Sequence, residues 1–494
     1  MRTVLLVGGA LVWAALGAAG CSSSKAEPTY LSRDELLDPV TCNKCHADHF
    51  RDWSQSMHAY ASDDPVFIAM NARGQRETNG ALGSFCVNCH APMALRDGKT
   101  TDGLNLGSVD AKYKGVTCFF CHTVDSVLGD HNNPLHSASD IVMRGAFSNP
   151  VANTAHPAGY SGLHDRNHLE SAQLCGACHD IVNTNGVAIE RTYDEWKNHT
   201  VFSHSPGGET CGQCHMNQSG TPLPVAQAPG VPNRYYHAHD FPGIDVGLTP
   251  FPSADQKTQK ESVTTFLDTS IQSSLCVGEG TAGFTVILDN VAAGHGWPSG
   301  SAQDRRAWVE LIAYSGQNVI YQTGVVPDGT PVTKINDPDL WLFRDCMLDS
   351  KDDEVTMFWQ AQSPSESYEL PGSMTFDASD PRFYQTHIYQ TFPQSTAVTQ
   401  APDRVTLRVR MQPIGLDVLD DLAASGDLKD PSVRAQMATL TYDVGAKPLV
   451  EWTQATASMG FVDPVTHIPY SCATNTSGSF ITQVPAPVHV HCKP

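Results

Sequence analysis

Five copies of one short cysteine–histidine pattern occupy the first half of this 494-residue chain. In each copy two residues separate a pair of cysteines, and a histidine follows the second cysteine directly. Composition alone predicts on the order of 0.02 such matches in a chain of this length. In chain order, motifs 1 to 5 are Cys42, Cys45 and His46; Cys86, Cys89 and His90; Cys118, Cys121 and His122; Cys175, Cys178 and His179; Cys211, Cys214 and His215.

This spacing is the one that attaches c-type haem. Two thiols three positions apart reach the two vinyl groups of one porphyrin, and the histidine that follows lies beneath the iron as its first axial ligand. Four-cysteine zinc sites also use such pairs, but they do not require a histidine after each second cysteine. Disulfides fit less well, because a two-residue spacer is more typical of redox or metal motifs. We expect five covalently bound haem c groups.

The amino terminus has the pattern of an export signal. A short basic start precedes the apolar run Val4–Leu16, which is too short to cross a bilayer comfortably. We expect residues 1–20 to be a signal peptide and residues 21–40 to form a tether.

Cys21 follows small residues in a pattern that resembles a bacterial lipobox, although Ala18 stands where leucine is usual. An ordinary cleaved signal with an unrelated cysteine is the alternative. The resemblance implies that Cys21 carries a lipid anchor, and the absence of aspartate at position 22 favours the outer membrane. We therefore expect an exported periplasmic or outer-membrane lipoprotein.

Four further cysteines stand alone downstream: Cys276, Cys346, Cys472 and Cys492. An even set of isolated cysteines in an exported protein predicts disulfides. Three pairings are open, and a free thiol is the less favoured alternative.

The pattern changes near residue 250, so we expect a pentahaem domain over residues 41–250 and a second domain over residues 251–494. The first has so few apolar residues per motif that the haems are expected to serve as its core, with little regular structure. Short helices are predicted at Arg33–Leu37 and Tyr193–Asn198, and Gly220–Pro232 is predicted to be an extended connector.

The second domain is predicted to be mainly β and sandwich-like. Apolar and polar residues alternate along Val405–Met411, so one face of this strand is expected to be buried. A helix is expected over Ala254–Leu267, and a helical insertion within the sandwich over Leu416–Ala424 and Pro431–Leu440. Further strands are predicted at Phe284–Leu288, Trp308–Tyr314, Val319–Tyr321 and Gln385–Phe392.

Residues around the motifs resemble those of exported bacterial multihaem c-type cytochromes. Trp53 with Ser56-Met57-His58-Ala59, Gly115-Val116-Thr117-Cys118 and Thr192-Tyr193-Asp194-Glu195-Trp196 resemble the haem module of the tetrahaem cytochrome that takes electrons from hydroxylamine oxidoreductase. Downstream, Ala293–Gly300 and Arg305–Trp308 resemble the β-domain that many such cytochromes carry. The resemblance implies electron transfer between redox partner proteins.

Each iron also needs a second axial ligand or an open position. His58 matches a distal-ligand position of the family, and His156 and His164 precede motif 4 at similar places. Of His237 and His239, which follow motif 5, we favour His239. His295 lies in a glycine-rich turn from which it could reach a haem. Other histidines are expected to lie at the surface or to form hydrogen bonds.

Three functions remain in view. The favoured one is a non-catalytic electron carrier with every iron six-coordinate. The alternative is an oxidoreductase that acts on a small inorganic molecule at one open haem; nitrite-reducing relatives often carry lysine in place of one motif histidine, but all five motifs here end in histidine. A third is a partner-docking role for the sandwich. The formal charge of −21 argues against binding to nucleic acid.

Overall fold

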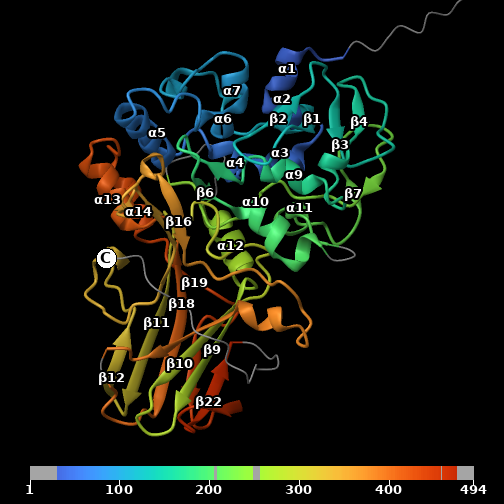
Figure 1. Cartoon of the computed structure of the whole chain (residues 1–494). Coiled ribbons are helices and arrows are strands. Elements are labelled where there is room, and N and C mark those ends of the chain that lie inside the picture. The colour runs from blue at the N-terminus through green and yellow to red at the C-terminus, as the bar shows by residue number, and fades with distance from the viewer. Residues whose placement is uncertain (1–29, 205–207, 249–255, 396, 458, 476–494) are drawn as a thin grey trace, which may run out of the picture.

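The computed structural model describes residues 30–204, 208–248, 256–395, 397–457 and 459–475. The predicted signal peptide and Cys21 lie outside these ranges, as do Ala254 and Cys492. Figure 1 shows the motif-bearing part of the chain, rich in short helices, above a part built from long strands. Among the described residues, no helix has the length and apolar character needed to cross a membrane.

The motif-bearing part consists of brief helices and two-stranded ribbons. Its α-helices are α1 (Arg33–Leu37), α2 (Pro39–Asn43), α3 (Ala47–Ser54), α4 (Met57–Tyr60), α5 (Pro65–Glu77), α6 (Val87–His90), α7 (Pro92–Arg96), α8 (Cys118–Thr123), α9 (Ser171–Gly176), α10 (Thr192–Asp194) and α11 (Cys211–His215). Its strands are β1 (Val124–Val127), β2 (Leu135–Ser137), β3 (Met143–Gly145), β4 (Ala158–Tyr160), β5 (Ile181–Val182), β6 (Ala188–Glu190), β7 (Leu223–Pro224) and β8 (Asn233–Arg234).

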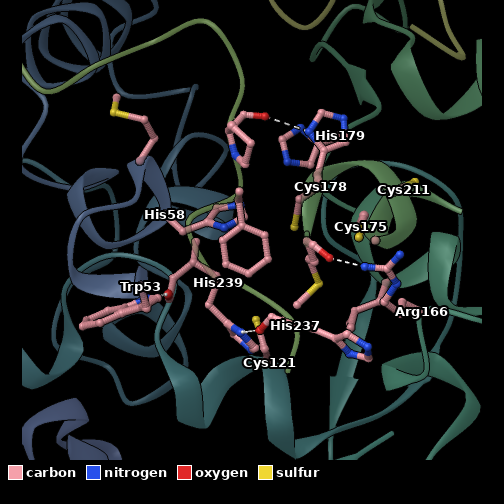
Figure 2. A pocket seen from close by; sticks show the side chains of 18 of the residues that line it. Trp53, His58, Cys121, Arg166, Cys175, Cys178, His179, Cys211, His237 and His239 are labelled. Carbon is pink, nitrogen blue, oxygen red and sulfur yellow. Dashed lines mark hydrogen bonds between the residues drawn. The ribbon is translucent and has the colours of Figure 1, made fainter. Parts of the chain in front are cut away.

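The motifs coincide with helix boundaries. Helices α8 and α11 both begin at the first cysteine of a motif, and in each the preceding threonine accepts a hydrogen bond from a backbone N–H of the first turn. Such side-chain caps satisfy donors that a helix start would otherwise leave unpaired. The local sequence therefore fixes where these helices begin. The cavity between the motif helices is shown in part in Figure 2.

Contrary to expectation, this part has an apolar core of its own. Leu36 and Leu37 of α1, Val87 of α6 and Phe119 and Phe120 of α8 are buried in one cluster. Helix α1 matches its predicted bounds, whereas the connector Gly220–Pro232 contains β7, which pairs with β8. At Tyr193–Asn198 the chain forms α10 followed by a π-helical turn, Glu195–His199.

Two antiparallel sheets make up most of the second part. One has the strand order β17-β10-β9-β22-β21, and the other has β12-β11-β18-β19, with β13 and β20 also paired to it. Their strands are β9 (Ile271–Gly278), β10 (Phe284–Asn290), β11 (Arg306–Ser315), β12 (Asn318–Thr323), β13 (Leu342–Phe343), β17 (His387–Phe392), β18 (Arg404–Gln412), β19 (Tyr442–Asp443), β20 (Val450–Thr453), β21 (Met459–Val462) and β22 (Pro469–Thr474). A small third sheet contains β14 (Asp345–Leu348), β15 (Glu354–Val355) and β16 (Ser363–Ser367).

The two large sheets share one hydrophobic core. Val286 and Leu288 of β10 lie in the same buried cluster as Val309 of β11 and Leu407 of β18. This arrangement is consistent with the predicted β domain. The helices are α12 (Gln256–Leu267), α13 (Leu416–Ala424) and α14 (Pro431–Met437). Two expected bounds were wrong: α14 ends three residues before Leu440, and Gln385 belongs to a 3-10 helix that precedes β17.

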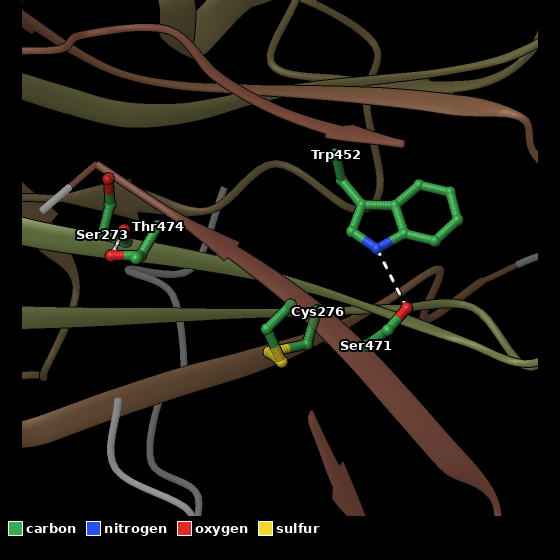
Figure 3. Close-up of a disulfide and its surroundings, with 6 residues drawn as sticks. Ser273, Cys276, Trp452, Ser471 and Thr474 are labelled. Carbon is green, nitrogen blue, oxygen red and sulfur yellow. Dashed lines mark hydrogen bonds between the residues drawn. A yellow bond between two sulfur atoms is a disulfide. The ribbon is translucent and has the colours of Figure 1, made fainter. Parts of the chain in front are cut away.

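One of the predicted disulfides links two neighbouring strands. Cys276 on β9 and Cys472 on β22 are directly opposite each other in the sheet and form a disulfide. Nearby, the Trp452 indole N–H donates to the Ser471 hydroxyl at 3.1 Å (Figure 3). Cys346 is disulfide-bonded as well. The disulfide between Cys276 and Cys472 thus links two neighbouring strands that are far apart in the sequence.

Candidate haem-binding cavity

One large cavity collects the residues singled out from the sequence. Its volume is about 2090 Å³, and its walls include every cysteine and histidine of the five motifs. All five predicted distal histidines also line it: His58, His156, His164, His239 and His295. The donor set and the space are those that covalently attached haems require, so the residues present fit this cofactor.

Four motif histidines each face a second imidazole at nearly the same separation. Two imidazoles that bind one metal ion through nitrogens about 2 Å from it place their ring centres about 6 Å apart. The observed separations between ring centres fall between 6.2 and 6.5 Å. The pairs are His46 with His156, His179 with His58, His122 with His239, and His215 with His295.

The paired rings come from distant parts of the chain. His58 lies on α4, close in sequence to motif 1, yet it faces His179 of motif 4. Figure 2 shows these two side chains reaching into the same space. His295 comes from the loop after β10 and so brings the second part of the chain to motif 5.

Burial keeps these imidazoles neutral. Together with neighbouring histidines, it lowers the pKa of His58 and of His239 to about 3. Burial also lowers the pKa of His215 to about 4. A neutral imidazole has the free nitrogen lone pair that a metal ligand needs.

His164 and His90 depart from this pattern. The His164 ring centre is 5.6 Å from that of His122, and its Nε2 lies 2.8 Å from the carbonyl oxygen of Cys121, while its Nδ1 is buried without a hydrogen-bond partner. The His90 ring stacks on Phe67 at 4.1 Å with nearly parallel planes. In the part of the chain that the structure describes, no second imidazole faces His90 at ligand spacing.

The Nδ1 atom of each motif histidine also has an oxygen atom within hydrogen-bond distance. Backbone carbonyl oxygens lie within hydrogen-bond distance of Nδ1 in four cases: Val225 for His46, Ala61 for His90, Arg144 for His122 and Pro242 for His215. His179 instead has the carboxylate of Glu190, at 3.3 Å from Oε1. Such bonds fix the ring orientation and leave Nε2 directed at the metal.

Contacts between thiols show which motifs adjoin. Cys42 and Cys118 lie close together, which lowers the pKa of the first thiol and raises that of the second, so motifs 1 and 3 adjoin. Cys175 and Cys211 form the same kind of pair between motifs 4 and 5.

Motif 4 has a second contact of this kind. Cys178 lies near Cys89, and this neighbour raises the pKa of the Cys178 thiol, so motif 4 adjoins motif 2. Burial and, to a smaller extent, the nearby Cys175 of motif 4 raise the pKa of Cys121 in motif 3 to about 12. Motif 4 thus lies among motifs 2, 3 and 5.

Two asparagines brace the contact between motifs 2 and 4. Asn132 and Asn133 both have positive φ angles, of 59° and 55°. The Asn133 backbone N–H donates to the Ala177 carbonyl, and its side-chain amide donates to the Asn88 carbonyl. The Asn88 side chain returns a bond to the Asn132 carbonyl at 2.9 Å. Sequence analysis missed this brace because nothing in the spacing of these residues indicates it.

The sequence analysis also missed His49. Its ring centre lies 4.8 Å from that of His239 and 5.8 Å from that of His46. Burial, with smaller contributions from His239 and His46, lowers its pKa to about 2. His49 thus packs between the imidazoles of motif 1 and those facing motif 3.

Comparisons with known proteins agree with this cavity. The family model described as cytochrome c554 and c-prime matches residues 41–123, which span motifs 1 to 3. The crystal structure of a penta-heme cytochrome c552 from Thermochromatium tepidum superposes with a TM-score of 0.55 at 18% identity, covering 86% of this chain and 100% of that one. Both comparisons support a multihaem c-type cytochrome.

A search of the curated proteins found no significant match. The likeness to the cytochrome c552 concerns the fold and includes the sheet-rich part, since it covers most of both chains. At this identity the structural likeness shows the fold, and the family model covers the part of the chain that holds motifs 1 to 3.

Proposed function

We propose that this protein is an exported pentahaem electron carrier, with residues 41–250 as the haem-binding domain and residues 251–494 as the β domain. The observation that carries the proposal is the set of four imidazole pairs at 6.2 to 6.5 Å. An iron held by two imidazoles is low-spin and has no position for a substrate, so its use is to accept and release electrons. The proposed partners are redox proteins that supply and remove them.

In this proposal His58, His156, His239 and His295 are the second axial ligands of motifs 4, 1, 3 and 5. We favour His239 over His164 for motif 3, because the Nε2 of His164 is engaged by the Cys121 carbonyl. Electrons would move between motifs whose cysteines are neighbours: motif 1 to motif 3, then motif 4, and from there to motif 2 or motif 5.

Intact mass tests the cofactor content directly. Protein from a host that matures c-type cytochromes should exceed its polypeptide mass by five haem masses after acid–acetone extraction, because thioether bonds survive that treatment. A Cys86→Ala/Cys89→Ala variant should lose one haem mass and serves as the internal standard. A wild-type mass without these increments would contradict covalent attachment.

A second function is favoured by one observation, the unmatched His90. An iron held by His90 alone would keep one axial position open to a small molecule such as a nitrogen oxide. Ferrous wild-type protein should then bind about one carbon monoxide per chain, because imidazole pairs occupy both axial positions of the other four irons. Optical titration with carbon monoxide measures this. Binding well below one equivalent would remove the substrate-binding role and leave the carrier role in place.

We also propose membrane attachment through a lipid on Cys21. A Cys21→Ala variant should move from the membrane fraction to the soluble periplasmic fraction, since a lipid chain supplies the membrane affinity. Immunoblots of fractionated cells measure the distribution. A Ser24→Ala variant is the control for a substitution in the same tether, and equal distribution of wild type and Cys21→Ala would contradict the anchor.

A further inference from the structure

Motif 4 differs from the other motifs in the chemistry behind its histidine. Its His179 Nδ1 lies 3.3 Å from a carboxylate oxygen of Glu190, whereas the other four motif histidines have neutral backbone carbonyls as partners.

The structure holds Glu190 firmly in place. It ends strand β6, where it is the register partner of Ile181 on β5, and its side chain is 13% exposed. Because β5 begins two residues after His179, the same short ribbon carries both the imidazole and its carboxylate partner. The hydrogen bond is therefore built into the local fold.

A carboxylate partner changes what an imidazole does for a metal. It draws the Nδ1 proton towards itself, makes the ring a stronger electron donor and favours the oxidised metal ion. A backbone carbonyl has a weaker effect of the same sign, because it carries no net charge. Two irons with the same axial ligands can therefore differ in reduction potential, because the hydrogen bonds at Nδ1 of their histidines differ.

Motif 4 lies next to several other motifs, so its reduction potential affects electron transfer among them. Its Cys178 lies near Cys89 of motif 2, and its Cys175 lies near Cys211 of motif 5 (Figure 2 labels Cys175, Cys178 and Cys211). Cys121 of motif 3 lies close by as well. Motif 4 is therefore a junction that connects motifs 1 and 3 with motifs 2 and 5.

We propose that Glu190 makes the iron site of His179 the lowest-potential site of the chain, at the junction through which electrons reach motifs 2 and 5. The inference rests on the proposed carrier function. The iron sites of motifs 2 and 5 are then reduced before the iron site of motif 4, and electrons that reach motif 4 pass on to these neighbours. Glu190 acts through His179 and is a positioning and tuning residue.

A redox titration followed by electron paramagnetic resonance tests the proposal on the intact holoprotein. The ring planes of His58 and His179 are inclined by 55°, whereas the other three pairs are inclined by 17° to 30°. Strongly inclined imidazoles give ferric low-spin iron a larger maximal g-value than nearly parallel ones, so the motif 4 signal is recognisable. In wild-type protein this signal should be the last to disappear on reduction.

Glu190→Gln keeps the size of the side chain and its hydrogen-bond acceptor but removes the charge. The reduction equilibrium constant of the inclined signal should rise at least tenfold, equal to about 59 mV for one electron, while the other signals stay within a small fraction of that shift. Glu190→Asp, which keeps the charge and shortens the reach, should give a smaller shift in the same direction and provides a second variant if the glutamine protein folds poorly.

Glu209→Gln is the matched control, because Glu209 lies near Cys214 of motif 5 but does not contact a motif imidazole. An equal shift of the inclined signal in Glu209→Gln and Glu190→Gln would mean that net charge, not the bond to His179, sets the potential, and would overturn the inference. An unchanged midpoint in Glu190→Gln, or an inclined signal that is reduced before the others in wild type, would also overturn it. Loss of low-spin signals altogether would instead contradict the carrier function itself.

Discussion

Ferrous His58→Ala protein should bind about one more carbon monoxide per chain than wild type, and the ferric protein should show one additional high-spin iron. His58 faces His179 across 6.2 Å, so removing its imidazole opens the axial position opposite His179. Alanine cannot coordinate the metal, and the cavity around it remains accessible to a small ligand. Optical spectra, electron paramagnetic resonance and carbon monoxide titration measure the change.

The control for this prediction is His237→Ala. His237 lines the same cavity and is labelled beside His239 in Figure 2, but its ring faces no motif imidazole among the described pairs. Its variant should keep the wild-type spin state and stoichiometry. If His58→Ala also keeps them, His58 is not a ligand, and the pairing with His179 has a structural role only.

Gly115→Ala should be the most destabilising of the small substitutions near the cavity. Gly115 has a φ of +67°, and a Cβ there would lie 2.5 Å from the Ala59 carbonyl oxygen and 2.7 Å from that of His58. The left-handed backbone costs an alanine about 1–2 kcal/mol, and forcing an atom into packed backbone costs about 1–3 kcal/mol more. Because the clash is with the helix that bears His58, the fraction of high-spin iron should rise as well.

Gly80→Ala separates the two costs. Gly80 has a φ of +80°, but a Cβ at this position would have no neighbour within 4 Å. Its variant should show only the backbone cost, about 1–2 kcal/mol, with an unchanged spin state. Thermal unfolding followed by circular dichroism compares the two proteins. Equal melting temperatures would show that α4 yields to the added methyl group and that Gly115 is not required to hold His58.

Local signals in the sequence were sufficient where the chemistry is local. A haem attachment motif is complete within five residues, so all five motifs could be recognised without knowledge of the fold. The bounds of α1 and α13 matched their predictions because local signals decide them: a capping box at Ser32 starts α1, and apolar residues at helical spacing mark α13. The alternation in Val405–Met411 likewise indicated β18.

Tertiary structure decided which histidine faces which motif. His58 is twelve residues from His46 in the sequence but faces His179, and His295 reaches motif 5 from beyond the first strands of the second part. The sequence listed these histidines as candidates, but a second axial ligand is defined by its position in space, and several segments can supply it. The unmatched His90, the thiol contacts at motif 4 and the Glu190 carboxylate behind His179 depend on the same packing. The sequence by itself predicted five haem attachment motifs and their positions, while the packing of distant segments determined which imidazole faces each motif histidine and which motifs adjoin.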